Sequence, residues 1–168
     1  MRFFTSGWHA GDMSDGDAVL IPVRYAEHLA ALLPRLPAAV GERLASIDFH
    51  DAQIRRCTLD HRDQTLSFSL IVGDRQSAYT AIDLHYQEVA IDRLDLAALR
   101  SAAADPKSEL LYDEIDEDGG YFVHRYLFWP YQAFDIFFRS VQLETAPAPT
   151  RLPLEREVRY TELHAPAI

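Results

Sequence analysis

The feature of the sequence that most constrains the fold is a hairpin in the last third of the chain. Two strand-like runs surround a Gly-Gly centre in the segment LLYDEIDEDGGYFVHRYLFW, residues 110–129. Because glycine adopts the positive φ values of a tight primed turn without strain, Gly119 and Gly120 predict a short connection between two antiparallel strands. The fold must therefore contain an antiparallel sheet, which the chain's nine Phe and eight Tyr also favour.

The register of this hairpin stays open, and each choice gives the side chains a different role. If the two glycines form the loop, Glu114 lies opposite Arg125 and the two make a cross-strand ion pair. If the loop lies one residue earlier, Asp113 lies opposite His124 and supplies half of an acid/base or metal site. The sequence does not choose between these registers.

Alternation of polar and apolar residues predicts four further strands. They cover residues 52–60, 65–70, 78–86 and 131–143, and the first two form a hairpin through a short polar connection. The last strand changes phase after Phe138. This change predicts a β-bulge near Arg139 or Ser140.

Helical spacing of apolar residues predicts helices before and between these strands. One helix begins at residue 22 and ends at 34, a second covers 37–47, and a short crossover helix covers 94–104. Residues 3–20 are predicted to form a loop or a short edge strand. The predicted fold is therefore α+β: an antiparallel meander sheet of about five to six strands, with two N-terminal helices and one short crossover helix packed on it.

Length and composition predict one domain. A chain of 168 residues that is 48% hydrophobic can bury a core without disulfides, and we assign residues 1–145 to a single α+β domain. Residues 146–168 form a Pro-rich C-terminal extension, expected to add an edge strand, embrace a second subunit or stay mobile. The lone cysteine, Cys57, excludes an internal disulfide and a thiolate zinc site, and it fits a reducing compartment.

Charge and hydropathy bound the possible partners. With a net charge of −10, the chain lacks the basic face that a phosphate backbone needs, so we expect no nucleic-acid partner. The same acidity favours a basic protein partner. No apolar run approaches the roughly 20 residues that cross a bilayer, and the N-terminus lacks the apolar core of a signal peptide. We therefore expect a cytoplasmic protein with no membrane partner.

Motifs for metals, nucleotides and hydrolysis are incomplete or missing. The acidic run Glu114-x-Asp116-x-Asp118-Gly119 imitates the start of a calcium loop, but Arg125 occupies the twelfth position, where a bidentate Glu should stand. The seven histidines show no paired metal-ligand spacing, and the chain has no Gly-x-Ser-x-Gly elbow, P-loop or dinucleotide fingerprint. We expect no metal, no cofactor and no catalytic residue that the sequence identifies.

Two groups of residues are candidates for binding. His50 and Asp51 stand where the chain enters its first long strand, and they either fix that junction or join Asp113 and His124 in a His/Asp cluster. The final hairpin holds more aromatic residues than one buried face requires, and Tyr, Trp and Arg beside acids are typical of protein interfaces. The candidate binding residues are His50, Asp51, Asp113, Glu114, Tyr121, His124, Arg125, Tyr126 and Trp129.

Short patterns in the sequence resemble a family of uncharacterised, single-domain bacterial proteins. The patterns are Phe3-Phe4-Thr5 with Trp8, His50-Asp51-Ala52, Leu111-Tyr112-Asp113-Glu114-Ile115, and the Tyr-x-x-His of Tyr121 to His124. The resemblance covers most of residues 1–145 and implies a compact α+β fold in a bacterial cytoplasm, but it brings no activity, and the Pro-rich tail departs from it. Small acidic α+β chains also resemble bacterial toxin-immunity proteins in fold class and composition.

These observations support three hypotheses about function. The first is a non-enzymatic cytoplasmic protein-binding module of immunity or regulatory type, whose contact surface is the acidic, aromatic-rich final hairpin and strand. The second is a small-molecule-binding or hydrolytic enzyme, which requires the four side chains of the His/Asp cluster to meet in a concave pocket. The third is a homodimer formed through an edge strand or the tail, without chemistry.

Overall fold

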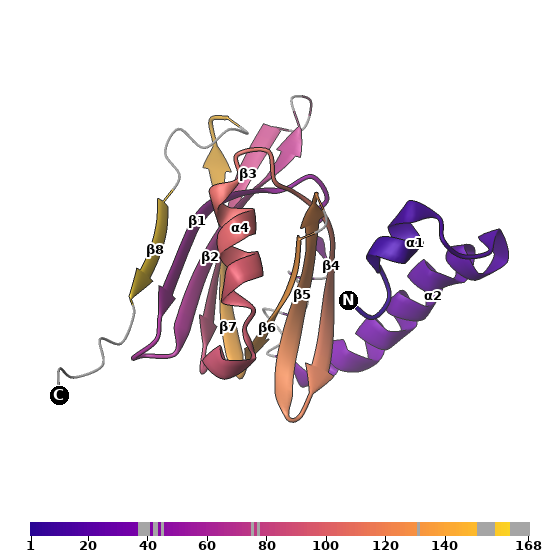
Figure 1. Cartoon of the computed structure of the whole chain (residues 1–168), viewed down its shortest axis with the longest axis horizontal. Helices are drawn as coiled ribbons and strands as arrows, with labels where there is room; N and C mark the ends of the chain where they lie inside the picture. The colour runs from indigo at the N-terminus through magenta and orange to yellow at the C-terminus, as the bar shows by residue number, and fades with distance from the viewer. Residues whose placement is uncertain are drawn as a thin grey trace.

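The computed structural model of the protein describes residues 1–36, 41, 44, 46–74, 76, 78–130 and 132–150, together with the backbone of 157–161. The strands form two adjacent β-sheets, with helix α4 beside them (Figure 1). The fold class is α+β, as predicted. The expected single meander sheet of five to six strands is wrong, because the strands divide between two sheets that share one core.

The first sheet, sheet A, has the strand order β7-β3-β2-β1-β8. Its strands are β1 (Gln53–Asp60), β2 (Thr65–Asp74), β3 (Ala78–Gln87), β7 (Ser140–Ala148) and β8 (Glu157–Thr161). The antiparallel meander of β1, β2 and β3 confirms the strands predicted at these positions. β7 pairs antiparallel with β3, and β8 pairs parallel with β1. The C-terminal extension therefore adds an edge strand, which is one of the three roles expected of it.

The second sheet, sheet B, has the strand order β4-β5-β6 and contains the predicted hairpin. Its strands are β4 (Glu109–Asp118), β5 (Tyr121–Trp129) and β6 (Gln132–Phe138). Gly119 and Gly120 join β4 to β5 with φ angles of 59° and 79°, the positive values that a type I′ turn requires. The two glycines thus form the loop, and Glu114 lies opposite Arg125 in the ladder.

The long strand predicted over residues 131–143 is two strands in different sheets. β6 ends at Phe138 in sheet B, β7 begins at Ser140 in sheet A, and Arg139 is the one residue between them. The change of phase that predicted a bulge marks the place where the chain crosses between the sheets. Val141 and Leu143 return to the shared core because sheet A faces sheet B from the other side.

The N-terminal segment is helical where the sequence predicted a loop or short strand. It forms α1 (Ser6–Ala10), with Thr5 as N-cap, and α2 (Asp15–Leu32), with Ser14 as N-cap. α2 therefore begins before Pro22, which lies inside the helix. A proline at this position leaves the carbonyl of Ala18 without its helical donor. The indole N–H of Trp8 donates to that oxygen at 3.1 Å, so the carbonyl has a donor although the helix continues through the proline.

The remaining helical segments are short. They are η1 (Leu33–Arg35), η2 (Ile91–Arg93) and α4 (Leu96–Ala104). α4 confirms the predicted crossover helix, and the Asp95 carboxylate caps it by accepting the Ala98 N–H at 2.9 Å. The helix predicted over residues 37–47 falls mostly on positions outside the described residues and stays a prediction.

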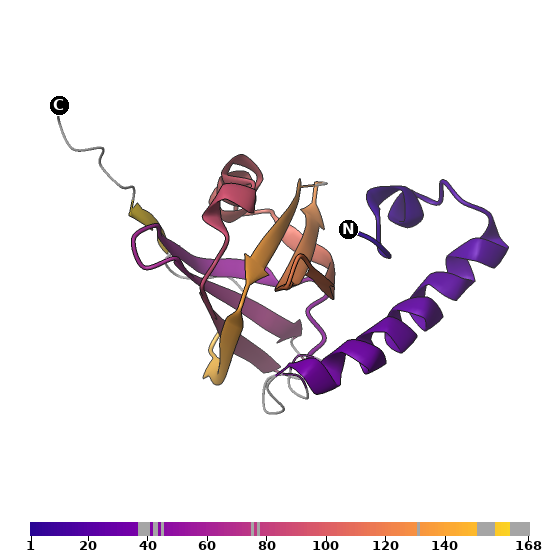
Figure 2. The same ribbon diagram turned by 90° about the horizontal axis from the view of Figure 1, so that it is seen from below.

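One main hydrophobic core lies between the two sheets. Phe68 of sheet A contacts Tyr126 and Phe134 of sheet B, with ring centroids 5.3 and 6.1 Å apart. α1 and α2 lie on the other side of sheet B, away from sheet A (Figure 2), and Leu32 is the one residue of α2 that is buried. We call residues 1–32 the arm, and we call the two sheets with α4 the body.

Candidate functional site

The acidic run that the sequence singles out lies on β4, and each of its carboxylates is bonded within the chain. Two of these residues, Glu114 and Asp116, are buried. The contacts are Asp113 with His124, Glu114 with the backbone of residues 2–4, Asp116 with Arg125, Glu117 with Arg35 and Asp118 with Arg93. β4 thus connects the arm, η1, η2 and β5, and much of its charge is compensated within the chain.

The Glu114 carboxylate fastens the start of the arm to sheet B. It accepts the backbone N–H groups of Arg2, Phe3 and Phe4 at 2.7, 2.7 and 2.5 Å. These converging amides replace the water that burial removes from the charge. The ion pair predicted between Glu114 and Arg125 is therefore wrong, although the two residues are opposite in the ladder, because the arm already satisfies the carboxylate.

Arg125 instead belongs to a row of charges on the outer face of sheet B. Its guanidinium contacts Asp135 on β6 and lies 3.3 Å from Asp116 on β4. Asp116 also lies 3.0 Å from Nε2 of His28 on α2 and 3.4 Å from Arg2. Burial raises the pKa of the Asp116 carboxyl, but the backbone N–H of Glu117 and the side chains of Arg125, His28 and Arg2 outweigh it, so the pKa falls below its ordinary value.

On the inner face of sheet B, His124 belongs to a hydrogen-bonded group of four side chains. Its Nδ1 is 2.7 Å from the Tyr86 hydroxyl and 2.9 Å from the Tyr126 hydroxyl, and these two hydroxyls are 2.6 Å apart. Its Nε2 is 3.0 Å from Asp113. Burial raises the pKa of both tyrosines, so both are neutral hydrogen-bond partners. The group is a satisfied polar core between the sheets.

The sequence predicts a contact between Asp113 and His124 only for the register whose loop lies one residue earlier. This prediction is wrong. In the observed register Ile115 lies opposite His124, and Asp113 is two residues from Ile115 on the same face. Diagonal neighbours on one face of a sheet are close enough for polar side chains to meet. The contact therefore forms in the observed register, in which Gly119 and Gly120 are the loop.

His50 and Asp51 lie apart from this buried group. Nδ1 of His50 is 3.1 Å from the Asp51 carboxylate, and the two side chains are 47% and 58% exposed. The His50 ring packs edge-on against Tyr112, which stacks on Phe4 of the arm. Because successive residues of a strand point to opposite faces, Tyr112 and Asp113 belong to different sides of sheet B. The structure pairs His50 with Asp51 and His124 with Asp113, but it does not gather the four in one concave site.

The other candidate residues differ in exposure. Trp129 is 46% exposed at the end of β5, and the Arg139 guanidinium lies 4.2 Å above the Tyr121 ring. Glu114, His124 and Tyr126 are buried, so they cannot touch a partner of the folded protein.

Two residues of structural importance, Tyr86 and Trp8, were not among the candidates that the sequence indicated. For Tyr86, the signal was a hydroxyl at an apolar position of a predicted strand, because a buried hydroxyl needs a hydrogen-bond partner. For Trp8, the signal was Pro22 within a helical pattern, because a proline there leaves a carbonyl without its donor.

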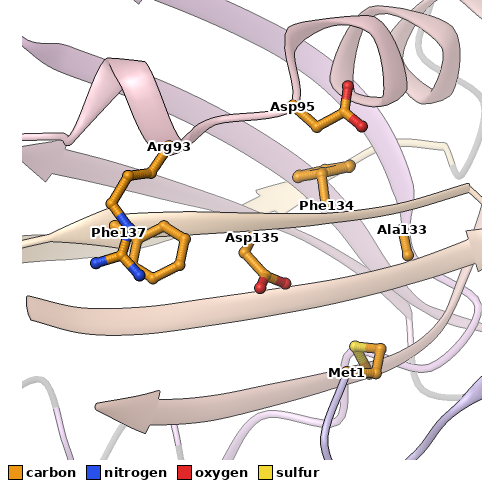
Figure 3. A pocket seen from close by; sticks show the side chains of 7 residues that line it. All are labelled: Met1, Arg93, Asp95, Ala133, Phe134, Asp135 and Phe137. Atoms are coloured by element: carbon orange, nitrogen blue, oxygen red, sulfur yellow. The ribbon is translucent and has the colours of Figure 1, made fainter. Parts of the chain in front are cut away.

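An open pocket of about 510 Å³ lies on the outer face of β6, between Met1 and the segment that joins η2 to α4 (Figure 3). It is lined by Met1, Arg93, Asp95, Ala133, Phe134, Asp135 and Phe137. Its charged groups already have partners: Arg93 stacks 3.6 Å above Phe137 and pairs with Asp118, and Asp135 binds Arg125. The pocket therefore offers little uncompensated charge to a ligand.

Comparisons with known proteins return no match: no family model, no curated protein and no solved structure is similar to this chain. The resemblance to an uncharacterised bacterial family and to immunity proteins stays a prediction. Within the described residues, no helix is long and apolar enough to span a membrane. The same residues contain no group of three or more His, Cys, Asp or Glu side chains placed to hold a metal ion.

Proposed function

We propose that this chain is a non-enzymatic protein-interaction module whose contact surface is the outer face of α2. The exposure of apolar side chains on that helix carries the proposal. Among the described residues, the exposed large hydrophobic side chains are Val19 at 71%, Leu20 at 44%, Val23 at 53% and Trp129 at 46%. Three of these four lie within two turns of α2. Apolar side chains gathered on one exposed face are typical of interaction sites.

The opposite side of α2 is attached to sheet B, so the exposed face is turned away from that sheet. The Tyr25 hydroxyl accepts the backbone N–H of Ile115 at 2.9 Å, and His28 lies 3.0 Å from Asp116. Both contacts are made to β4. A partner that fits the outer face of such a helix is an amphipathic α-helix, which lays its own apolar stripe along the first.

Other surfaces have weaker support. The final hairpin, favoured by the sequence, is partly covered by the arm, and its acidic side chains are bonded within the chain. A basic partner and an immunity or regulatory role stay predictions. The enzyme alternative gains no specific observation, because His124 has no exposed surface through which a substrate could reach it.

The test is site-specific photo-crosslinking in cells that make the protein. A photoreactive amino acid replaces Val23 on α2 or, as a matched control, the exposed Ala97 on α4. We expect a discrete adduct at position 23, with mass spectrometry placing the link on an amphipathic helix, and none at position 97. The adduct should disappear when Val19→Glu is added. Equal adducts at both positions, or none at position 23, would contradict the proposed function.

A further inference from the structure

β8 lies at the edge of sheet A opposite to β7. The strand order β7-β3-β2-β1-β8 places three strands between β7 and β8, although β8 is the strand that follows β7 in the chain. β8 pairs parallel with β1 along five residues, and position 158 lies opposite Cys57 in this ladder. We call the side of β1 that β8 occupies the β1 edge. The strand that fits the β1 edge is thus a strand of this chain itself.

The residues between β7 and β8 must cross the width of the sheet. Four strand spacings separate the two strands, which corresponds to about 19 Å. Through the ladders, Ala148 at the end of β7 lies level with Gly73 of β2. Glu157 at the start of β8 lies level with Ser69, four residues away on the same strand. The two ends are therefore offset by about 13 Å along the strands and lie roughly 23 Å apart.

The connection is barely long enough for this distance. Nine steps along the chain join residue 148 to residue 157, and they include the prolines at 149 and 153. At about 3.1 Å per residue for an extended proline-rich segment, nine steps reach about 28 Å. The direct line between the two ends runs inside the sheet, where β3, β2 and β1 already lie, so the connection has to leave the plane of the sheet and return. A single chain therefore reaches its own β1 edge with almost no slack.

We propose that β8 is exchanged between two copies of this chain, so that each β8 pairs with the β1 edge of the partner. Exchange keeps the backbone pairing of the β1–β8 ladder, because each copy supplies the same two strands. It also frees the connection from the width of one sheet, because the distance to the partner's β1 edge depends on how the two bodies meet. Short connections under tension favour such an exchange.

The exchange is reciprocal and separate from the proposed function. Each chain gives one strand and receives one, so the assembly closes at two copies related by a two-fold axis. Two ladders hold the copies together, and each of them pairs five residues of β8. β8 lies at the far end of the molecule from α2 (Figure 2), so the outer face of α2 stays available in the dimer.

A disulfide across the ladder tests the exchange in the full chain. Cys57 is the only cysteine and is buried, and opposite residues of neighbouring strands lie within the range that a disulfide bridges. In the Val158→Cys chain, mild oxidation should link position 57 of one copy to position 158 of the other. We expect a covalent dimer on a non-reducing gel, with the 57–158 link identified by mass spectrometry. Gln142→Cys, exposed on β7, is the control and should give no link to Cys57.

A longer connection supplies the matched comparison. In a second Val158→Cys chain, about eight flexible Gly and Ser residues are inserted after Thr150 to span the sheet without tension. Its 57–158 link should form within one chain, because a flexible tether gives β8 a far higher effective concentration at its own β1 edge, and the dimer fraction should fall at least about tenfold.

Three results would overturn the exchange. The first is a 57–158 link that forms mainly within single chains of natural length. The second is the absence of this link from both chains, which would contradict the β1–β8 pairing on which the proposal rests. The third needs no substitution: a natural chain that sediments as a monomer at every concentration. Crosslinking at position 23 on α2 does not depend on any of these results.

Discussion

The body and the arm hold their shapes by different forces. The body buries a continuous apolar core between two sheets, and its inner polar group of Tyr86, His124 and Tyr126 is bonded internally. The arm buries one residue of α2 and is attached to β4 through backbone amides, a phenol, ion pairs and the contacts of the Phe4 and Trp8 rings with Tyr112. Apolar burial accumulates with area, whereas partly exposed ion pairs contribute about 0–1 kcal/mol each. The arm should therefore open locally at a much smaller free energy than the body unfolds.

The largest expected effect comes from the core of the body. Phe68→Ala removes a ring that contacts both Tyr126 and Phe134 across the two sheets. We expect it to lower the free energy of unfolding by about 3–5 kcal/mol, through lost burial and the cavity left behind. Urea denaturation followed by circular dichroism measures the change. A loss below about 1 kcal/mol would mean that the sheets do not depend on this contact.

The next effect separates the arm from the body. Glu114→Gln removes the charge that three backbone amides of residues 2–4 share. We expect a cost of about 1–3 kcal/mol, seen by hydrogen exchange as faster exchange in α1 and α2 and unchanged exchange in β1, β2 and β3. Glu144→Gln, on an exposed position of β7, is the matched control. Equal acceleration in both regions would break the distinction between arm and body.

Alkaline pH probes the body through its buried phenols. Tyr86 and Tyr126 have raised pKa values in the folded protein, whereas an unfolded tyrosine titrates near 10. Above that pH the unfolded chain releases protons that the folded chain retains, so stability falls as pH rises, by about 1.4 kcal/mol per pH unit for each tyrosine. Tyr86→Phe should make the fall shallower in urea titrations between pH 9 and about 11. An unchanged slope would argue against the raised pKa.

The smallest effect concerns the proline inside α2. Trp8→Phe removes the indole donor of the Ala18 carbonyl and should cost about 1 kcal/mol. Pro22→Ala restores the helical donor, so Trp8→Phe should cost less in that background than in the natural chain. A double-mutant cycle on arm stability measures the coupling. Strict additivity of the two substitutions would show that the hydrogen bond contributes nothing.

Local signals predicted much of the body, and the missed features are non-local. The Gly119–Gly120 turn, the β1–β2–β3 meander and α4 each depend on a pattern within a few residues, and each is present. Alternation shows which side chains face a core, but not which strand is the neighbour. The split at Arg139 therefore resembled a bulge, although β7 pairs with β3 more than fifty positions earlier in the chain.

The candidate site shows the same limit. Asp113 and His124 are one strand-length apart, and the sequence analysis named both, although it assigned their contact to the wrong register. Glu114 was equally prominent, but its partners are backbone amides, which every residue except proline possesses. The sequence therefore contains no particular residue type that identifies the partner of a carboxylate bound by backbone amides. The attachment of the arm was therefore invisible without coordinates.

The hydrogen bond from Trp8 to Ala18 should couple positions 8 and 22 in evolution. Pro22 removes the backbone donor of the Ala18 carbonyl, and a side chain from α1 supplies another. In a descendant that loses Trp8, loss of Pro22 as well should restore stability. Loss of Pro22 first is the safer order, because the helix then supplies its own donor to the Ala18 carbonyl. Coevolution of positions 8 and 22 should accordingly be visible wherever this arm is inherited.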